Sequence, residues 1–466
     1  MSEYSYDWFH RTFRDIEEDI GLFDLRVDDT LVWERLRFPV HQQIRNSLVH
    51  ADSSGGTDYA GTPLAARLGR VGTALTRRNP FLTSPRDTLV WGHNRRKFRE
   101  DGQYWDIYCD PLYDRLDTSY LHLENPHKGT HYRPAKTDQL RYMDGLHTAS
   151  SLYERVSHAD VSLSRSQRRL CRRATERFAA AFAVDIDIER RVRTAVAERR
   201  ATKPFYGALL DWHNPSLVVV VVSYGKETFV EACKERDIPV AELQHGVVTP
   251  FHYGYSYPGS RTKATFPDLF LTFGEFWADS VEFPTDTTVE PVGYPFLEQG
   301  VKRTADTDRR NRVVFVSQCS IGASLSEVAV AFDDLTDMEV VYKLHPEEYT
   351  VWRDNYPWLQ SSSVDVIADD GPTLYDLFAT SQAQVGVYST ALFEGVRFGL
   401  ATYVLTEPGM EYVRSLLDAG AATAVDSVEE LAAAVAEGTH GGIDVPYFFE
   451  PNPLANIERA LADARR

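Results

Sequence analysis

Cysteine is scarce in this sequence, which has 466 residues and 4 cysteines, none of them in a C-x-x-C pair. That spacing disfavours a disulfide framework or a zinc site and is typical of a reducing compartment. Long apolar runs are also missing, since runs such as 217–222 are far too short to span a membrane. The N-terminal stretch 1–21 is polar and lacks the apolar core of a signal peptide. We therefore expect a cytoplasmic protein that associates with the inner face of a membrane at most peripherally.

Lysine is rare as well. It supplies 9 of the 50 basic residues, against 68 acidic residues and a net charge of −18. A surface this negative repels nucleic acid, so we expect no nucleic-acid partner. Two explanations of the composition compete. A GC-rich genome favours arginine codons, whereas a cytoplasm of high salt favours a carboxylate-rich, lysine-poor surface that stays hydrated. The acidity and the lysine scarcity occur together, which favours the second explanation and predicts a halophile-like surface.

Two series of alternating strand and helix patterns organise the chain. The first becomes clear at the β-branched run 216–223, and the second starts at 313 after the polar linker 302–312. Such alternation predicts parallel sheets, and two series predict an α/β protein with two Rossmann-like domains facing a cleft. The length of the chain also favours two domains. The expected segments are a helical N-terminal extension over 1–80, an acceptor domain over 81–300, a nucleotide-donor domain over 313–445 and a C-terminal helix over 446–466 that packs back.

The first half of the chain has weaker patterns. Short apolar runs at 87–93, 105–110 and 119–124 predict strands, and an arginine-rich, alanine-rich stretch at 164–200 predicts a long helix.

Polar residues follow several predicted strands, where open α/β sheets bind ligands. His245 closes the strand at 240–244, and its ordinary pKa suits a general base near neutral pH. The alternative is a histidine that hydrogen-bonds a neighbouring loop. Lys343 and His345 lie on one side of a second strand, which Pro346 ends, and two cations there favour a phosphate site. The alternative is an edge lysine beside a buried, satisfied histidine.

Ser389 and Thr390 stand where a third strand runs into a helix, and hydroxyls with free backbone N–H groups favour an anion there. Glu394, one turn later, is placed to accept hydrogen bonds from a ribose. The alternative is an ordinary N-cap followed by a favourable first-turn carboxylate. Gln318 and Gly322 belong to a small loop after the first strand of the second series. This loop is neither a Walker loop nor a GxGxxG fingerprint, which disfavours a plain NAD enzyme.

Four segments together resemble a known group of enzymes. The segments are QHG at 244–246, GYP at 293–295, KLHP at 343–346 and GVYSTALFEG at 386–395. In this order and at these separations they resemble the glycosyltransferase-B (GT-B) enzymes that build surface polysaccharides. The similar families are CDP-glycerol glycerophosphotransferases, bacterial sialyltransferases and capsule polysaccharide transferases. The resemblance covers about residues 215–425 and is absent from 1–200.

The resemblance implies a metal-independent transferase with no cofactor other than its nucleotide-activated substrate. His245 matches a histidine that acts as base in the glycerophosphotransferases. The resemblance implies that His345, Pro346, Ser389, Thr390 and Glu394 bind the donor, and the strand-end patterns add Gln318, Gly322 and Lys343. His93, Arg95, Arg96 and Tyr104 are expected to line the acceptor side, and the alternative is that the arginines belong to an ordinary solvated surface.

The sequence also departs from these families. The glycerophosphotransferase segment Trp-His-Gly-Thr-Pro is Gln-His-Gly-Val-Val-Thr-Pro here, and the Asp before Tyr-Ser-Ser is replaced by Gly386-Val387. The acidic base motif of the sialyltransferases is absent from the first series. We therefore expect transfer of a sugar or a polyol phosphate from a nucleotide-activated donor to a hydroxyl of a surface-glycan or lipid-linked acceptor. A sugar-nucleotide 2-epimerase and a non-catalytic sugar- or nucleotide-binding protein are the alternatives.

Overall fold

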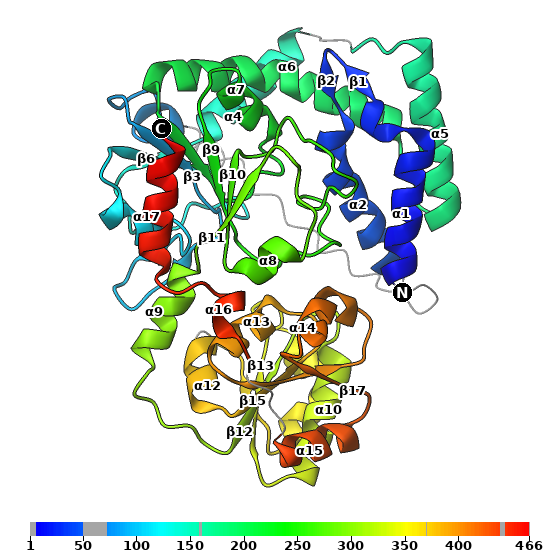
Figure 1. Cartoon of the computed structure of the whole chain (residues 1–466), viewed down its shortest axis with the longest axis vertical. Helices are drawn as coiled ribbons and strands as arrows, with labels where there is room; N and C mark the ends of the chain where they lie inside the picture. Colours follow the sequence, from blue (N-terminus) through cyan, green and yellow to red (C-terminus); the bar gives the residue numbers. More distant parts are fainter. Residues whose placement is uncertain (1–5, 50–71, 158–160, 370, 439–442, 466) are drawn as a thin grey trace.

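Two parallel sheets form the frame of the computed structural model, which describes residues 6–49, 72–157, 161–369, 371–438 and 443–465 (Figure 1). The first sheet has the order β11-β10-β9-β8-β3-β6-β7 and the second the order β14-β13-β12-β15-β16-β17. All strand pairs in both sheets are parallel. The structure thus confirms the predicted α/β class with two Rossmann-like domains.

The strands of the first domain are β3 (Thr88–Trp91), β6 (Tyr120–Glu124), β7 (Leu140–Tyr142), β8 (Leu217–Val220), β9 (Val240–Leu243), β10 (Leu269–Thr272) and β11 (Thr288–Pro291). Those of the second are β12 (Arg312–Val316), β13 (Glu339–Lys343), β14 (Asp365–Ile367), β15 (Ala383–Gly386), β16 (Ala401–Leu405) and β17 (Thr423–Val425). Central strands such as β8 and β12 are buried along their whole length, which explains their continuous apolar sequence.

Helices cover both faces of each sheet (Figure 1). The first domain contains α4 (Asp144–Ser157), α5 (Arg165–Phe182), α6 (Ile188–His213), α7 (Glu227–Lys234), α8 (Glu275–Asp279) and α9 (Pro295–Arg303). The second contains α10 (Gly322–Leu335), α11 (Trp352–Asn355), α12 (Leu374–Thr380), α13 (Thr390–Arg397), α14 (Arg414–Asp418) and α15 (Val428–Glu437). Short 3-10 helices are η1 (Leu22–Asp24), η2 (Asp110–Arg115), η3 (Pro357–Ser361) and η4 (Met410–Val413). In the described residues, no helix combines the length and the apolar character that crossing a membrane requires.

Each sheet reverses its order beside its first strand. In the first domain β3 lies between β6 and β8, and in the second β12 lies between β13 and β15. The loops that leave the two central strands at such a point run to opposite faces of the sheet. They open a crevice at the carboxyl edge, where ligands of open α/β sheets bind. A place where the strand order reverses in this way is called a topological switch point. The fold therefore supplies one switch point in each domain.

Two expectations about the first half of the chain need correction. Residues 105–110 do not form a strand: Trp105 ends the short hairpin of β4 (Lys97–Phe98) and β5 (Tyr104–Trp105), and η2 begins at Asp110. The reason is local, because the Asp106 carboxylate accepts the backbone N–H groups of Tyr108 and Cys109 and bends the chain. The stretch 164–200 forms two helices, since Ala183 adopts a left-handed conformation that ends α5.

The N-terminal segment forms a helical layer beside the first domain (Figure 1). Its helices are α1 (Tyr6–Ile20) and α2 (Trp33–Val49), joined by η1 and the small hairpin β1 (Arg26–Val27) and β2 (Thr30–Leu31). Apolar side chains of both helices share a core with α5 and the start of α6. The expected extension over 1–80 also includes 1–5 and 50–71, which lie outside the described residues.

The C-terminal segment crosses back to the first domain through α16 (Val445–Phe448) and α17 (Pro453–Ala464) (Figure 1). Ile457 and Leu461 pack in a core with residues of β3, β8, β9 and β10. The crossing chain lies so close to the first domain that a Cβ atom on Gly293 would sit 2.2 Å from the carbonyl oxygen of Glu450. Gly293 also has a φ of 93°, so the glycine of the GYP segment is required by packing.

A buried ion pair fixes the N-terminal layer. Glu17 and Arg37 are both almost fully buried, and the Glu17 carboxylate accepts hydrogen bonds from Arg37 Nε at 2.7 Å and from Trp33 Nε1 at 2.6 Å. The Arg37 guanidinium also donates to the carbonyl oxygen of Ser256 in the first domain. The layer is thus joined to the loop that follows β9.

Replacing Glu17 by alanine will leave the buried Arg37 charge without its partner. We expect the Glu17→Ala variant to lose about 3–5 kcal/mol in the free energy of unfolding, measured by urea denaturation. Glu18→Ala is the matched control, because Glu18 is exposed and pairs with Arg261 at the surface, where such pairs contribute at most about 1 kcal/mol. Equal effects of the two changes would contradict this role of Glu17.

Candidate functional site

A cavity of about 240 Å³ lies between the N-terminal layer and the two domains, and we call it the cleft cavity. Its second-domain wall comes from the loops that follow β12 and β15 and from η4. Its other walls come from α2 and from the loop after β9. The lining residues are Phe38, His41, Gln42, Arg45, Val247, Thr249, Phe251, His252, Gln318, Tyr388, Ser389, Thr390, Tyr412 and Val413.

Buried polar atoms without a protein partner concentrate in this lining. Neither ring nitrogen of His41, nor Nδ1 of His252, has a hydrogen-bond partner among the described residues. The same holds for Thr249 Oγ1, Gln318 Oε1 and Arg45 Nε. Buried polar groups in native proteins almost always have partners, so a cluster of six such atoms around one cavity marks a place that holds water or a polar ligand.

Arg45 brings positive charge to the cleft cavity. Its guanidinium donates one hydrogen bond, to the hydroxyl of Tyr412 at 3.3 Å, and no carboxylate of the described residues forms an ion pair with it. The N-terminus of α13 faces the same cavity through Ser389 and Thr390. Ser389 acts as the N-cap, accepting the N–H of Ala391 at 3.2 Å, so the ordinary-cap alternative describes its hydroxyl. An arginine and a helix N-terminus over one cavity favour an anion.

His245 lies after β9 in a network of hydroxyl groups. Its Nδ1 is 3.2 Å from the Tyr255 hydroxyl, which donates to Glu242 Oε1 at 2.6 Å. Because the Tyr255 proton is used in that bond, Nδ1 must carry the ring proton and donate it to Tyr255. Nε2 then keeps its lone pair, and the Tyr224 hydroxyl lies 3.2 Å from it. The arrangement fixes the tautomer that accepts a proton at Nε2.

Burial lowers the pKa of His245 well below its ordinary value, and the charges of His93, His252 and Lys226 lower it further. The ring is therefore neutral at neutral pH. Burial raises the pKa of Glu242, and Lys226 opposes that rise. Through the Tyr255 hydroxyl, Glu242 is linked to the His245 ring.

The turn after β8 is strained. Val222 has a φ of 71°, a left-handed conformation that a β-branched residue rarely adopts. The Lys226 amine holds this turn by donating to the carbonyl oxygens of Val221, at 2.8 Å, and Val222. The turn places Tyr224 against His245 at the switch point of the first domain. Strain of this kind persists where the surrounding structure imposes it, often at functional sites.

Lys343 and His345, the two residues expected to form a phosphate site, differ in how their side chains are used. Glu347 donates its backbone N–H to His345 Nδ1 at 3.3 Å, so the ring proton belongs on Nε2, which has no partner among the described residues. Lys343, by contrast, donates to the Tyr349 hydroxyl at 2.9 Å and to the carbonyl oxygen of Asp369 at 2.6 Å. Pro346 continues the turn after His345. His345 is available to a ligand, whereas the Lys343 amine is used within its own domain.

Gly322 and Glu394 have identifiable neighbours. A Cβ atom on Gly322 would lie 2.1 Å from the Tyr356 hydroxyl, so close packing explains this glycine. Glu394, on α13, faces Lys97 of the first domain and Tyr375 of α12. Burial raises the pKa of Glu394, and the charge of Lys97 opposes that rise. Glu394 thus lies at the boundary between the domains rather than in the cleft cavity.

The four residues expected on the acceptor side separate into different environments. The His93 ring stacks on His245, with centroids 5.8 Å apart. Arg95 is exposed, and its charge contributes to lowering the pKa values of His345 and Glu347 in the second domain. The structure thus brings His93 and Arg95 to the site.

Arg96 and Tyr104 lie elsewhere. Arg96 is buried and donates to Glu124, Asp110 and His122, so its guanidinium is used inside the first domain. The Tyr104 ring packs between Phe98 and Tyr132.

Sequence reasoning missed the contribution of α2. Phe38, His41, Gln42 and Arg45 recur at helical spacing and line the cleft cavity. That pattern is visible in the sequence, but it does not show against which partner the polar face of the helix packs. The tyrosines around His245 were missed for a similar reason, since Tyr108, Tyr224 and Tyr255 come from three separate loops.

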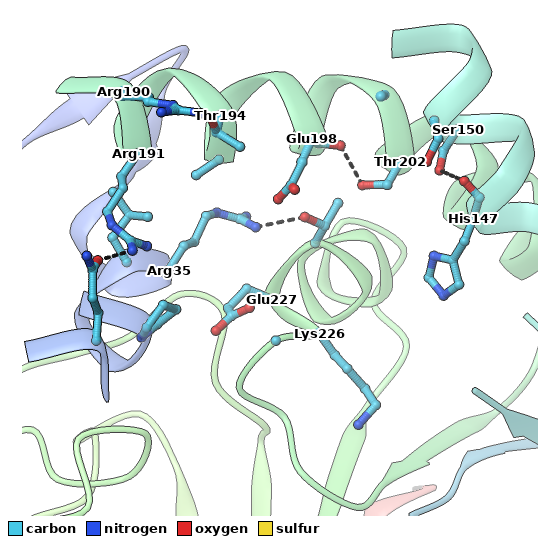
Figure 2. Close-up of a pocket in the computed structure, with 18 of the residues that line it drawn as sticks. Arg35, His147, Ser150, Arg190, Arg191, Thr194, Glu198, Thr202, Lys226 and Glu227 are labelled. Carbon is cyan, nitrogen blue, oxygen red and sulfur yellow. Dashed lines mark hydrogen bonds between the residues drawn. The ribbon is translucent and has the colours of Figure 1, made fainter. Parts of the chain in front are cut away.

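The opposite face of α2 lines a second cavity of about 850 Å³, shown in Figure 2. Arg190, Thr194, Glu198 and Thr202 follow one face of α6 along its upper wall. Arg35 reaches across it from α2 to Thr228, at 2.8 Å, and to Glu231. This face of α6 therefore borders the second cavity, which lies on the other side of α2 from the cleft cavity.

Comparisons with known proteins show the fold. No protein-family model matches the chain, and no curated protein matches it. Among solved structures, MurG of Acinetobacter baumannii has a TM-score of 0.50 and 9% identity, covering 81% of this chain and 100% of that chain. A UDP-GlcNAc 2-epimerase of Methanocaldococcus jannaschii, in complex with UDP-GlcNAc and UDP, has a TM-score of 0.45, 11% identity and coverages of 81% and 98%. Spinosyn rhamnosyltransferase SpnG has a TM-score of 0.42, 16% identity and coverages of 81% and 95%. The chain has the GT-B type of fold.

Buried histidines make the stability of this protein sensitive to mild acid. Burial lowers the pKa of His10 to about 3 and that of His122 to about 4. Each group is protonated in the unfolded chain below about pH 6.5 but not in the folded one, so stability falls as the pH falls from 6.5. His131, paired with Glu124 and Asp144, acts in the opposite direction because its pKa is raised.

We expect the free energy of unfolding to drop by about 3 kcal/mol between about pH 7.5 and 5.5 from His10 and His122 alone. Urea denaturation at several pH values measures this drop. A stability that stays constant until the carboxylates titrate, near about pH 4, would contradict it.

Proposed function

We propose that this chain transfers a sugar, or a polyol phosphate, from a nucleotide-activated donor to a hydroxyl group of an acceptor. The observation that carries the proposal is the cleft cavity, where Arg45, the N-terminus of α13 and six unpartnered buried polar atoms meet. The phosphates of a nucleoside diphosphate suit Arg45 and the N-terminus of α13. Its ribose hydroxyls and its base suit the six polar atoms. The resemblance of the QHG, KLHP and GVYSTALFEG segments to polysaccharide-building transferases supports the same assignment.

The second domain and α2 together hold the donor in this proposal. Arg45 and the backbone N–H groups at Thr390 bind the phosphates, and His345 donates from Nε2. Gln318 Oε1 accepts a hydrogen bond from the ribose or the base. Lys343 holds the adjoining loop rather than the phosphate, because its amine is already bonded to Tyr349 and Asp369.

The first domain supplies the base. His245 Nε2 takes the proton of the acceptor hydroxyl as the oxygen forms its bond to the transferred group and the bond to the donor phosphate breaks. The leaving nucleotide carries the charge, which Arg45 and the dipole of α13 stabilise. Closure about 295–312 brings the two domains together and excludes water. No metal or further cofactor takes part in these steps, and the acceptor is a surface glycan or a lipid-linked glycan presented at the membrane.

A sugar-nucleotide 2-epimerase of the same fold is the second candidate. It requires acidic groups at the cleft, and the two buried glutamates near the domain boundary, Glu242 and Glu394, do not line the cleft cavity. The two reactions differ in a simple way, because an epimerase converts its substrate without an acceptor. A non-catalytic binding protein, the third possibility, would keep its function without His245.

A nucleotide screen tests the donor site. We expect one of UDP, GDP, CDP, CMP or dTDP to raise the melting temperature, since a ligand of the folded state stabilises it by mass action. Arg45→Ala should weaken that nucleotide about 10–100-fold, the equivalent of one lost charge-assisted contact, and Gln318→Ala should weaken it less. Arg173→Ala, an exposed change on α5, is the control and should leave binding intact. Absence of any shift, in low and in high salt, would sink the proposal.

His245→Ala separates chemistry from binding. With the donor found in the screen, we expect the transfer rate to fall about 10²–10⁴-fold while the dissociation constant of the nucleotide stays unchanged. Tyr255→Phe should lower the rate less, since the ring of His245 keeps its place but loses the link to Glu242. Full activity of His245→Ala would exclude His245 as the base, and turnover of the donor without an acceptor would favour the epimerase.

A further inference from the structure

Three side chains with metal-binding chemistry meet on the second domain. Cys319 belongs to the loop between β12 and α10, and His345 and Glu347 belong to the loop after β13. One sulfur, one ring nitrogen and one carboxylate oxygen from these residues all lie within 4.8 Å of one another. The loops start side by side because β12 and β13 pair in parallel, with Val316 opposite Lys343. The cluster is therefore a product of the sheet register.

The distance between the sulfur and the nitrogen matches tetrahedral zinc. Cys319 Sγ and His345 Nδ1 are 3.6 Å apart. Bonds of about 2.3 Å from zinc to sulfur and about 2.0–2.1 Å to nitrogen, at the tetrahedral angle, place the two ligand atoms about 3.5–3.6 Å apart. The separation of these two atoms therefore equals that of two ligands of one zinc ion.

The chemistry of the ligands favours the same kind of ion. A thiolate and an imidazole with one carboxylate suit zinc and similar transition metals, whereas magnesium and calcium prefer oxygen alone. Three protein ligands leave a fourth position open. The sequence gives no sign of this set, because Cys319 and His345 are 26 residues apart and form no short motif.

Glu348 holds both loops in place. It is buried and accepts the backbone N–H of His345 at 2.7 Å, the Ser317 hydroxyl at 3.0 Å and the Tyr356 hydroxyl at 2.7 Å. It thereby links the loop that carries Cys319 to the loop that carries His345. Partners of this kind orient metal ligands before the ion binds.

We propose that Cys319, His345 and Glu347 form a binding site for Zn²⁺ or a similar soft divalent cation. Glu347 leaves its ion pair with Lys128, in which both side chains are exposed, at little cost. The ion binds the Nδ1 lone pair in place of the Glu347 backbone N–H, which donates to it at 3.3 Å in this structure. His345 Nε2 stays accessible, so the site does not compete with the donor contact described above. An ion here joins the loops that follow β12 and β13, and the proposal does not depend on the proposed function.

Titration of the metal-free full-length protein tests the site. Calorimetry with Zn²⁺ should show one saturable equivalent, and Co²⁺ should produce a thiolate charge-transfer band with the visible absorption of four-coordinate cobalt. Cys319→Ser should abolish that band and weaken Zn²⁺ at least tenfold. The melting temperature of the metal-free Cys319→Ser variant should equal that of the unchanged protein, which shows that the variant is folded. The other three cysteines are buried and leave Cys319 as the exposed thiol.

Lys128→Ala is the matched control. It removes the ion-pair partner of Glu347 and keeps all three ligands, so Zn²⁺ should bind at least as tightly as to the unchanged protein. Failure to saturate, a Co²⁺ spectrum without a thiolate band, or equal Zn²⁺ affinity of Cys319→Ser would overturn the proposal. None of these results alters the nucleotide screen, which uses a chelator-treated protein and a different readout.

Discussion

The buried Glu17–Arg37 pair is the interaction on which the site depends. It fixes α2 in the N-terminal layer, and Arg37 reaches on to the carbonyl oxygen of Ser256 in the first domain. Because α2 carries His41 and Arg45 on one face, its position sets the shape of the cleft cavity. A segment that the two Rossmann-like domains do not need for their own sheets therefore provides the positive charge at their shared site.

The two switch points explain why the remaining groups converge. Parallel strands end at one edge of a sheet, and both sheets turn that edge toward the region between the domains. His245 and Tyr224 follow strands of the first sheet, and Gln318 and Ser389 follow strands of the second. Each group is supplied by a different loop, so its place depends on strand order rather than on any local motif.

The sequence predicts the sheets well and the site only in part. Continuous β-branched runs such as 216–223 are diagnostic of buried parallel strands, whereas 105–110 fails because one aspartate side chain bends the backbone. Looking for polar residues that follow predicted strands selects His245, His345 and Ser389. It does not reveal that Lys343 bonds within its own domain, nor that α2 lines the cavity. Those facts depend on contacts between segments far apart in the chain, which periodicity does not encode.

The N-terminal layer also touches the second domain. Asp7 of α1 pairs with Arg414 at 2.9 Å, and Arg45 of α2 bonds to Tyr412, while Lys128 and Glu347 join the domains at another point. The Asp7–Arg414 and Lys128–Glu347 pairs are exposed, and mobile ions weaken exposed pairs far more than buried ones. The interior of each domain is held by buried groups that salt barely affects. Ionic strength therefore acts on these exposed pairs, whereas the apolar contacts of Phe276 and Trp277 with Phe393 hold the two domains together at any salt concentration.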